Sequence, residues 1–216
     1  MDYSGAVTPG GPAAVRELPD LTISKLSVGP MDNNAYLLRC RQTGQQLLVD
    51  AANDADQLLS LVGDGGLDTV VTTHRHQDHW LALSEVLQAT GADSVAHPAD
   101  ADPLPAVTRT VSAGDTVRVG ECSLEVIHLV GHTPGSIALL YQDPAGVAHL
   151  FTGDSLFPGG PGRTTNSTDF ETLMDDLEAK IFGRLPDDTW FYPGHGNDST
   201  LGFERAAIPE WRARGW

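Results

Sequence analysis

A chain of 216 residues with 40% hydrophobic and 19% charged residues has an ordinary globular composition and is long enough to bury a core. Its formal net charge of −16 disfavours nucleic acid and anionic membranes as partners, because both repel an acidic surface. The two cysteines, Cys40 and Cys122, stand far apart and in no C-x-x-C pairing, which indicates neither a disulfide framework nor a thiolate zinc site.

The start of the chain has no signal-peptide pattern, and no apolar run approaches the ~18 residues of a membrane span, so we expect a cytoplasmic location. Residues 1–20 are predicted to form a flexible tail, because they contain Pro9-Gly10-Gly11-Pro12 and few large apolar side chains. Residues 21–216 are predicted to form a single domain.

Short strands follow the predicted tail, at residues 21–28, 34–39 and 45–49, and the last two form a hairpin. A helix is predicted over 54–62, with Asp54 as its N-cap. A strand at 69–73 leads to a helix that begins at Leu81 and ends near Thr90. The second half is predicted to contain strands at 94–96, 116–119, 123–129, 137–141, 147–151 and 189–192, and a loop at 98–105. A helix is predicted over 168–182, with a capping box of Thr168 and Glu171. A short helix at 201–207 and a tail from Pro209 follow. This order favours two sheets packed face to face with helices outside.

The most unusual stretch is His74-Arg75-His76-Gln77-Asp78-His79, with three histidines and one aspartate in six residues. It follows a predicted buried strand and precedes a predicted helix. At such a strand end His74 and His76 can point to one side, while Asp78 and His79 face a second point nearby. Imidazole and carboxylate are ligands of zinc and iron, so we interpret the stretch as half of a two-metal site and not as a solvated turn.

Three further candidate ligands stand just past predicted strands, and glycine flanks each of them. Glycine allows tight bends and a close approach of the backbone to a centre. Loops at one edge of a sandwich gather where sites are built. The predicted set is His74, His76 and His132 for one metal, Asp78, His79 and His195 for a second, and Asp154 as the bridge between them.

The other histidines are interpreted without a ligand role. His128 is predicted to support a ligand or to be packed in the fold, and His97 and His149 are predicted to be structural or surface residues. Asp50, at a strand end, is either a partner of a ligand or a turn cap, and we favour the turn cap.

Residues 74–79 resemble the H-x-H-x-D-H motif of the metallo-β-lactamase superfamily, and residues 131–136, 152–157 and 193–196 resemble its later motifs in order. The resemblance covers about 21–207 and implies an α+β fold, the four-layer αββα sandwich, with metals at one edge. Within the superfamily the chain is most similar to hydroxyacylglutathione hydrolase, or glyoxalase II, and its short bacterial relatives. In that family the positions of His74, His76, His132 and Asp154 bind one metal, and those of Asp78, His79, His195 and Asp154 bind the other.

Three departures from the glyoxalase II pattern concern the substrate. Leu81-Ala82 stand where the family has two glycines, and Gly160-Pro161-Gly162-Arg163 stands where it has Gly-Cys-Gly and a basic residue. Arg163 keeps the cation that meets the thiol carrier in the family, although a solvated surface arginine is the alternative. The chain also stops soon after Ala207, where glyoxalase II continues into a helical region that holds glutathione.

The predicted function is a binuclear metal-dependent hydrolase of a small-molecule thioester, with Asp78 both binding metal and orienting the attacking water. No general acid is evident, and a thiolate, whose parent thiol has a pKa of ~8.5, leaves without a proton better than an alkoxide. Two zinc ions are expected, although iron and manganese suit the same ligands.

The alternatives are a mononuclear iron persulfide dioxygenase, a lactone or ester hydrolase, and a non-catalytic metal-binding relative, while the oligomeric state stays open. A nuclease is disfavoured by the charge, and a β-lactamase by Asp154 and by the absence of an export signal.

Overall fold

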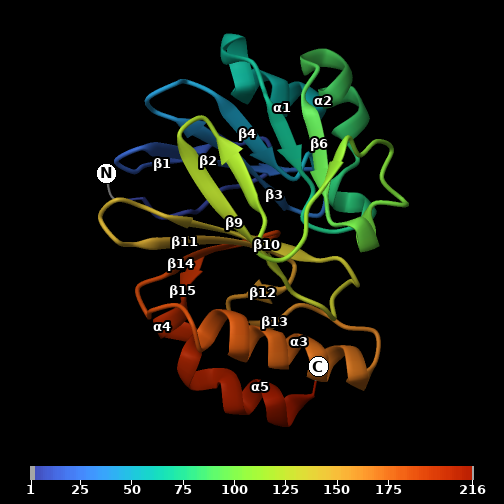
Figure 1. Cartoon of the computed structure of the whole chain (residues 1–216), viewed down its shortest axis with the longest axis vertical. Coiled ribbons are helices and arrows are strands. Elements are labelled where there is room, and N and C mark those ends of the chain that lie inside the picture. Colours follow the sequence, from blue (N-terminus) through green and yellow to red (C-terminus); the bar gives the residue numbers. More distant parts are fainter. Residues whose placement is uncertain (1–2, 216) are drawn as a thin grey trace.

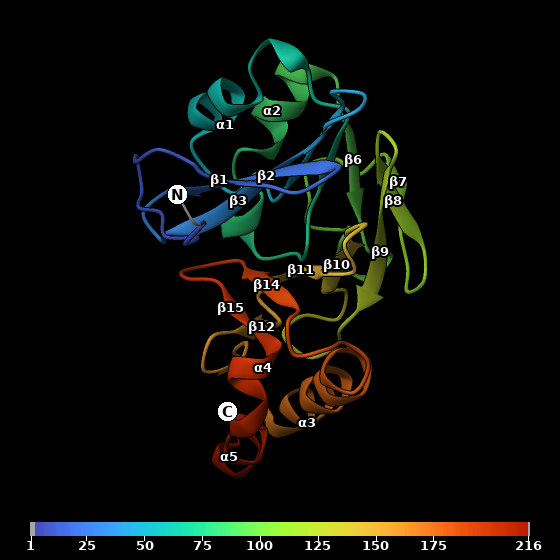
Figure 2. The ribbon, with the colours of Figure 1, turned by 90° about the vertical axis from the view of Figure 1, so that its left-hand side faces the viewer.

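The computed structural model describes residues 3–215, and two β-sheets face each other in it with helices on their outer sides (Figure 1). Helices α1 and α2 cover one sheet, and α3, α4 and α5 lie beyond the other (Figure 2). Because the helices lie outside and the sheets inside, the layers follow the order αββα. The predicted α+β sandwich of four layers is therefore confirmed.

The first sheet comes from the N-terminal half of the chain, and its seven strands lie in sequence order. Neighbours from β1 to β4 are antiparallel, whereas those from β4 to β7 are parallel. Parallel neighbours need a crossover, and α1 (Ala55–Val62) and α2 (Leu83–Thr90) supply two of them. The strands are β1 Ala14–Glu17, β2 Leu21–Val28, β3 Asn33–Cys40, β4 Gln46–Val49, β5 Thr69–Val71, β6 Asp93–Ala96 and β7 Arg109–Thr110.

The second sheet has six strands in the order β15-β14-β11-β10-β9-β8. Its strands are β8 Thr116–Val119, β9 Cys122–His128, β10 Ile137–Gln142, β11 Ala148–Gly153, β14 Trp190–Pro193 and β15 Ser199–Thr200. A two-stranded ribbon, β12 Leu156–Phe157 and β13 Gly160–Pro161, follows β11. The helices are α3 Ser167–Asp176, which continues as a π-helix over Leu177–Phe182, α4 Leu201–Glu204 and α5 Ile208–Arg214; short 3-10 turns span Gly63–Gly65, Gln77–His79, Pro98–Asp100 and Arg205–Ala207.

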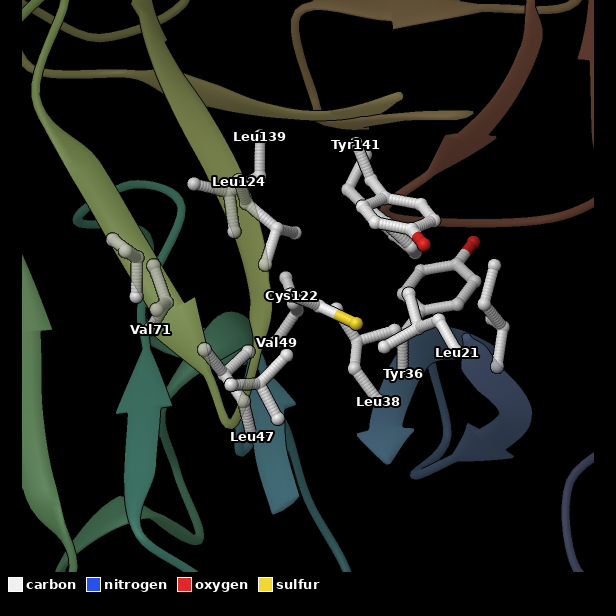
Figure 3. Packing of buried hydrophobic residues seen from close by; sticks show 14 of the residues in the cluster. Leu21, Tyr36, Leu38, Leu47, Val49, Val71, Cys122, Leu124, Leu139 and Tyr141 are labelled. Atoms are coloured by element: carbon white, nitrogen blue, oxygen red, sulfur yellow. The ribbon is translucent and has the colours of Figure 1, made fainter. Parts of the chain in front are cut away.

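Three apolar layers separate the four layers of secondary structure. Between the sheets, Leu21 and Leu38 of the first sheet belong to the same apolar cluster as Leu124 and Leu139 of the second (Figure 3). One outer cluster joins the first sheet to α1 and α2, and the other joins the second sheet to α3, the π-helix and α5. Burial on both faces explains why β10 and β11, which read IALLYQ and AHLFTG, are largely apolar and do not alternate between apolar and polar residues.

The N-terminal segment is not a flexible tail as predicted, since Ala14–Glu17 form β1 and pair with β2. Tyr3 also packs edge-on against Trp190, with ring centroids 6.0 Å apart. A buried ammonium explains this order: Lys25 Nζ donates to the Gly5 carbonyl at 2.9 Å and to Asp198 at 2.7 Å. A buried charge needs such partners, and the sequence pattern does not show where they come from. Met1 and Asp2, also within the predicted tail, lie outside the described residues.

The C-terminal segment from Pro209 is not the predicted tail, because Ile208–Arg214 form α5, and Trp211 is only 2% exposed. Proline at the second helical position is compatible with a helix start, which the tail prediction overlooks. Trp216 lies outside the described residues.

One predicted helix cap is wrong, and the other is right in its position but lacks the side-chain bond. Asn166, not Thr168, caps α3, and its side chain accepts from Asp169 N at 2.9 Å. Asp54 is the N-cap residue of α1 as predicted, but its side chain makes no cap bond, and its Oδ2 accepts from Gly29 N instead. Helix α2 begins at Leu83, two residues later than predicted, since the chain first forms the turn at Gln77–His79. The predicted loop at 98–105 begins with the turn Pro98–Asp100, and the sequence does not predict β1, β7, β12, β13 or β15.

Among residues 3–215, no helix is both long enough and apolar enough to cross a membrane.

Replacing Trp211 tests whether α5 belongs to the core. We expect Trp211→Ala to lower the free energy of unfolding by about 3–5 kcal/mol, because it empties a well-packed site. Urea unfolding followed by circular dichroism measures the loss. Phe203→Ala is the matched control, because Phe203 is 82% exposed and should change stability by less than about 0.5 kcal/mol. Equal effects of the two substitutions would contradict the docking of α5.

Candidate metal centre

The seven predicted ligands come from loops that follow strands of both sheets and meet at one rim of the sandwich. Residues 74–79 follow β5, His132 follows β9, Asp154 follows β11, and His195 follows β14. The structure brings all of them together in three overlapping groups, in each of which the ligand atoms lie within 4.8 Å of one another. The groups are His74, His76 and His132; His74, His79 and Asp154; and Asp78, His79 and His195.

The first group presents three imidazole nitrogens. His74 Nε2 lies 3.1 Å from His76 Nδ1 and 3.3 Å from His132 Nε2. Two nitrogens bound to one tetrahedral zinc ion at 2.0–2.1 Å stand about 3.3 Å apart. The spacing in the structure therefore fits a shared divalent ion.

The second group combines two imidazoles with a carboxylate. Asp78 Oδ2 lies 3.3 Å from His195 Nε2 and 3.5 Å from His79 Nε2. Asp154 stands between the groups, since its carboxylate oxygens lie 3.4 Å from His79 Nε2, 3.5 Å from His195 Nε2 and 3.7 Å from His132 Nε2. Asp154 therefore lies between the two groups, where the sequence predicts a bridge.

Hydrogen bonds fix the tautomer of two ligand histidines from the first motif. The carboxylate of Asp50 lies 2.9 Å from His79 Nδ1, so this nitrogen carries the proton. Asp50 also accepts from the Thr73 hydroxyl at 2.8 Å, and His74 Nδ1 therefore donates to that hydroxyl at 3.1 Å. When both rings are neutral, Nε2 is left as a lone pair that faces the site.

Backbone carbonyls fix two further histidines in the same way. His132 Nδ1 donates to the Arg163 carbonyl at 2.7 Å, and His195 Nδ1 donates to the Met31 carbonyl at 2.9 Å. Four Nε2 lone pairs therefore converge with two carboxylates, an arrangement in which acceptors face acceptors. A cation is the partner that satisfies all of them.

Two buried atoms of the described chain make the same point. His79 Nε2 and Asp154 Oδ1 are buried and have no hydrogen-bond partner. Leaving a buried acceptor without a partner costs free energy. A metal ion bound by both the imidazole nitrogen and the carboxylate oxygen would remove this cost. The residues present thus fit the divalent ions that the sequence predicts.

The electrostatics of the centre favour positive charge. Burial lowers the pKa of His74 well below its usual value, which keeps this ring neutral and able to coordinate. Burial also acts to lower the pKa of His79, but the Asp154 carboxylate and then Asp50 outweigh it and raise the value to about 10. Without a metal this position attracts a proton, and a divalent ion would compete for the same lone pair.

Known proteins resemble this chain over most of its length. Residues 28–195, more than half of the chain, match the family description "Metallo-beta-lactamase superfamily". This chain belongs to the metallo-β-lactamase superfamily.

Within the superfamily, a hydroxyacylglutathione hydrolase of Polaromonas sp. is 37% identical over 183 residues, 82% of this chain and 68% of that relative. The crystal structure of BLEG-1 B3 metallo-beta-lactamase has a TM-score of 0.77 at 25% identity and covers 88% of this chain and 99% of its own. TTHA1623, solved in a di-iron-bound form, has a TM-score of 0.69 at 29% identity. The match covers 84% of this chain and 96% of TTHA1623. This superfamily member therefore has relatives named hydrolases, and its fold implies divalent metal binding.

Asp50 is the clearest correction within the superfamily site. The sequence favours a turn cap, but the carboxylate holds His79 and accepts from both N and Oγ1 of Thr73. The left-handed backbone of Asp50, with φ of 60°, turns the carboxylate back toward β5. In the sequence, the only sign of this role is that Asp50 directly follows an apolar strand. That His79 is its partner is seen only in the folded structure.

Sequence reasoning missed two supporting residues. Asp100, which is buried, accepts from Arg75 N at 3.0 Å and from Gly135 N at 2.9 Å, so it joins the loop of His76 to that of His132. Asn33 at the start of β3 donates to Asp78 Oδ2 at 2.9 Å. An aspartate in a proline-rich loop and an asparagine at a strand start are too common to be recognised from sequence.

Glycine at position 194 is required by close approach. A Cβ there would contact Asp154 Oδ1 and lie 2.7 Å from His79 Cε1. The chain can carry His195 toward the centre only because this residue has no side chain.

One side of the centre is open to solvent. A hollow of about 540 Å³ lies beside His76 and is lined by Arg75, His76, Gln77, Asp102 and Pro103. The side chain of Arg163 is exposed, and its backbone carbonyl accepts from His132 Nδ1. Residue 163 therefore lies at the edge of the site. The ring of Phe157 lies 6.3 Å from that of His195 and adds an apolar surface.

The three remaining histidines lie outside the metal groups. His97 stacks on His128 at 4.0 Å, and His128 Nε2 donates to the Pro134 carbonyl in the loop of His132. His149 is buried, and its Nδ1 lies 3.0 Å from the Tyr192 hydroxyl. These packed positions agree with their predicted structural roles.

We expect Asp50→Asn to weaken metal binding roughly 10–100-fold, because an amide no longer fixes the His79 tautomer with a full negative charge. Competition with a chromophoric chelator measures the affinity. Asp64→Asn, in the exposed turn after α1, is the matched control. Unchanged affinity in Asp50→Asn would contradict the role of this carboxylate.

Proposed function

We propose that this superfamily member is a binuclear metal-dependent hydrolase that cleaves the thioester of a small thiol, as in glyoxalase II. The observation that carries the proposal is Asp154, whose carboxylate lies between the two ligand groups. The hydroxyacylglutathione hydrolase relatives support the reaction class.

The ligand residues would hold two ions, one among His74, His76 and His132 and the other among Asp78, His79 and His195, with Asp154 shared. Such ions supply a water of lowered pKa as nucleophile and an electrophile for the carbonyl oxygen. We propose zinc, since imidazole and carboxylate suit it, and iron and manganese fit the same set.

Asp78 is proposed to orient the attacking water as well as to bind metal. Its side chain is 21% exposed, so solvent reaches it, and the Asn33 amide restricts its rotation. A carboxylate held in one orientation accepts a hydrogen bond from water in a fixed direction, which aligns the oxygen for attack.

A thiolate leaving group suits these residues. A thiol with a pKa of ~8.5 departs as an anion without a general acid, which an alkoxide does poorly. Arg163, exposed beside the centre, would attract the acidic groups of a thiol carrier. The bridging position of Asp154 argues against the β-lactamase activity for which one structural neighbour is named, because the resemblance assigns this bridge to glyoxalase II-like members.

The proposed substrate is thus a small molecule, without nucleic acid or membrane partners, in keeping with the charge of −16. The cytoplasmic location stays a prediction, and so does the single domain, which was predicted over 21–216 but whose first sheet also includes β1.

Metal content and turnover together test the function. We expect two equivalents of divalent metal and hydrolysis of hydroxyacyl thioesters, with activity lost after chelation and restored by added zinc. The panel includes glutathione and other thiol carriers, matched oxygen esters, lactones and a β-lactam. Two bound metals with no thioester turnover would refute the proposal, as would one iron with oxygen uptake on glutathione persulfide.

Replacing Arg163 tests substrate binding. Arg163→Ala should raise KM for an anionic thioester roughly tenfold or more with little change in kcat, since a charge-assisted contact is lost from binding alone. Arg118→Ala, on an exposed position of β8, is the matched control. If KM of Arg163→Ala matches the unmodified enzyme, Arg163 is a solvated surface residue.

A further inference from the structure

The two cysteines, which are distant in sequence, meet between the two sheets. Cys40 ends β3 of the first sheet and Cys122 begins β9 of the second. Both are free and buried in the same apolar cluster between the sheets, and Cys122 Sγ donates to the Asp20 carbonyl at 3.4 Å. Figure 3 shows the Cys122 side chain directed from β9 toward the first sheet, near Leu38. The spacing of the two cysteines in the sequence indicates no disulfide, but it does not show that Cys40 and Cys122 lie close together in the fold.

This pair lies at the end of the sandwich away from the metal ligands. Strand β3 starts with Asn33, which contacts Asp78, and ends with Cys40. Seven steps of ~3.3 Å along a strand place the two ends roughly 23 Å apart. A change at the cysteines therefore leaves the ligand geometry in place.

The two turns that cover the pair approach each other closely. A Cβ at Gly120 would contact Thr43 Oγ1 and lie 2.8 Å from both Cβ and Sγ of Cys40. The absence of a side chain at position 120 lets the 120–121 turn of one sheet rest on the 41–44 turn of the other. The thiols are thus held together by the packing of the sheets.

The surroundings of the Cys40 sulfur favour a thiolate. Burial acts to raise its pKa, but the Thr43 hydroxyl and the backbone N–H groups of Thr43, Glu121 and Gln42 outweigh it and lower the pKa to about 7. Burial instead raises the pKa of Cys122 to about 11. One cysteine is therefore suited to attack and the other to remain a thiol until it is needed.

We propose that Cys40 and Cys122 form a reversible disulfide under peroxide, a redox cross-link between the two sheets that stabilises the protein without changing its active centre. This cross-link does not depend on the proposed hydrolase function.

The chemistry proceeds in two balanced steps. The Cys40 thiolate attacks one oxygen of hydrogen peroxide, the O–O bond breaks, and with one proton taken up the products are a sulfenic acid and water. The Cys122 thiol then attacks the Cys40 sulfur, an S–S bond forms, and the hydroxyl leaves with the thiol proton as a second water. Two thiols lose two electrons and peroxide gains them. Peroxide is little larger than water, which suits buried sulfurs, and a small thiol reverses the reaction by exchange.

Peroxide treatment of the whole protein tests the cross-link. We expect both thiols to resist alkylation after denaturation, the mass to fall by two hydrogens, and the two cysteine peptides to migrate as one species until reduced. Closing so long a loop should raise the thermal midpoint by roughly 5–15 °C. Turnover of whichever thioester the reduced protein hydrolyses should be unchanged, and the structural readouts apply even if none is found.

Three variants separate the steps. Cys122→Ser should accumulate a sulfenic acid at Cys40 that dimedone traps, whereas Cys40→Ser should not react at neutral pH. Thr43→Val should slow oxidation and move its pH dependence upward, because a donor to the sulfur is lost; Thr116→Val, exposed on β8, is the matched control. Two alkylatable thiols after peroxide, or cross-linked dimers in place of the internal bond, would overturn the proposal.

Discussion

Acceptor atoms facing one another across a shared centre are the feature on which the rest of this structure depends. The Nδ1 protons of His74, His79, His132 and His195 are committed to oxygens of the protein, so their Nε2 lone pairs point inward. With carboxylates added, this arrangement is unfavourable unless positive charge is present. The hydrogen bonds of the four Nδ1 atoms, which lie outside the ligand groups, therefore make the site favourable for a cation.

The surrounding layers supply the rigidity that such a centre needs. Each ligand loop follows a strand whose apolar residues are divided between the cluster between the sheets and one of the two outer clusters. Buried polar side chains then join the loops: Asp100 connects two of them, and Asn34 donates to the Pro193 and Gly196 carbonyls on either side of His195. Because these bonds involve buried groups, losing one leaves a costly unpaired atom, and the loops keep their positions.

The N-terminal segment belongs to the same support. Lys25 Nζ donates both to the Gly5 carbonyl and to the Gly196 carbonyl, so one buried ammonium joins the start of the chain to the loop of His195. The far end of the sandwich is joined in another way, by the contact of two turns around Cys40 and Cys122. Metal chemistry and thiol chemistry thus occupy opposite ends of one pair of sheets.

The sequence alone determined most of the longer strands, the αββα class and the seven candidate ligands, because strand periodicity and the spacing of His74, His76, Asp78 and His79 are local properties. Asp154, His132 and His195 were found because glycine and a preceding strand mark such loops. Tertiary structure alone decided the partners: Asp50 with His79, Asn33 with Asp78, Lys25 with Gly5, and Cys40 with Cys122. These contacts join residues far apart along the chain, and their energy comes from burial and hydrogen bonding that exist only once the sheets have packed. No local pattern encodes them, for the same reason that β1 and α5 looked like tails until their neighbours were in place.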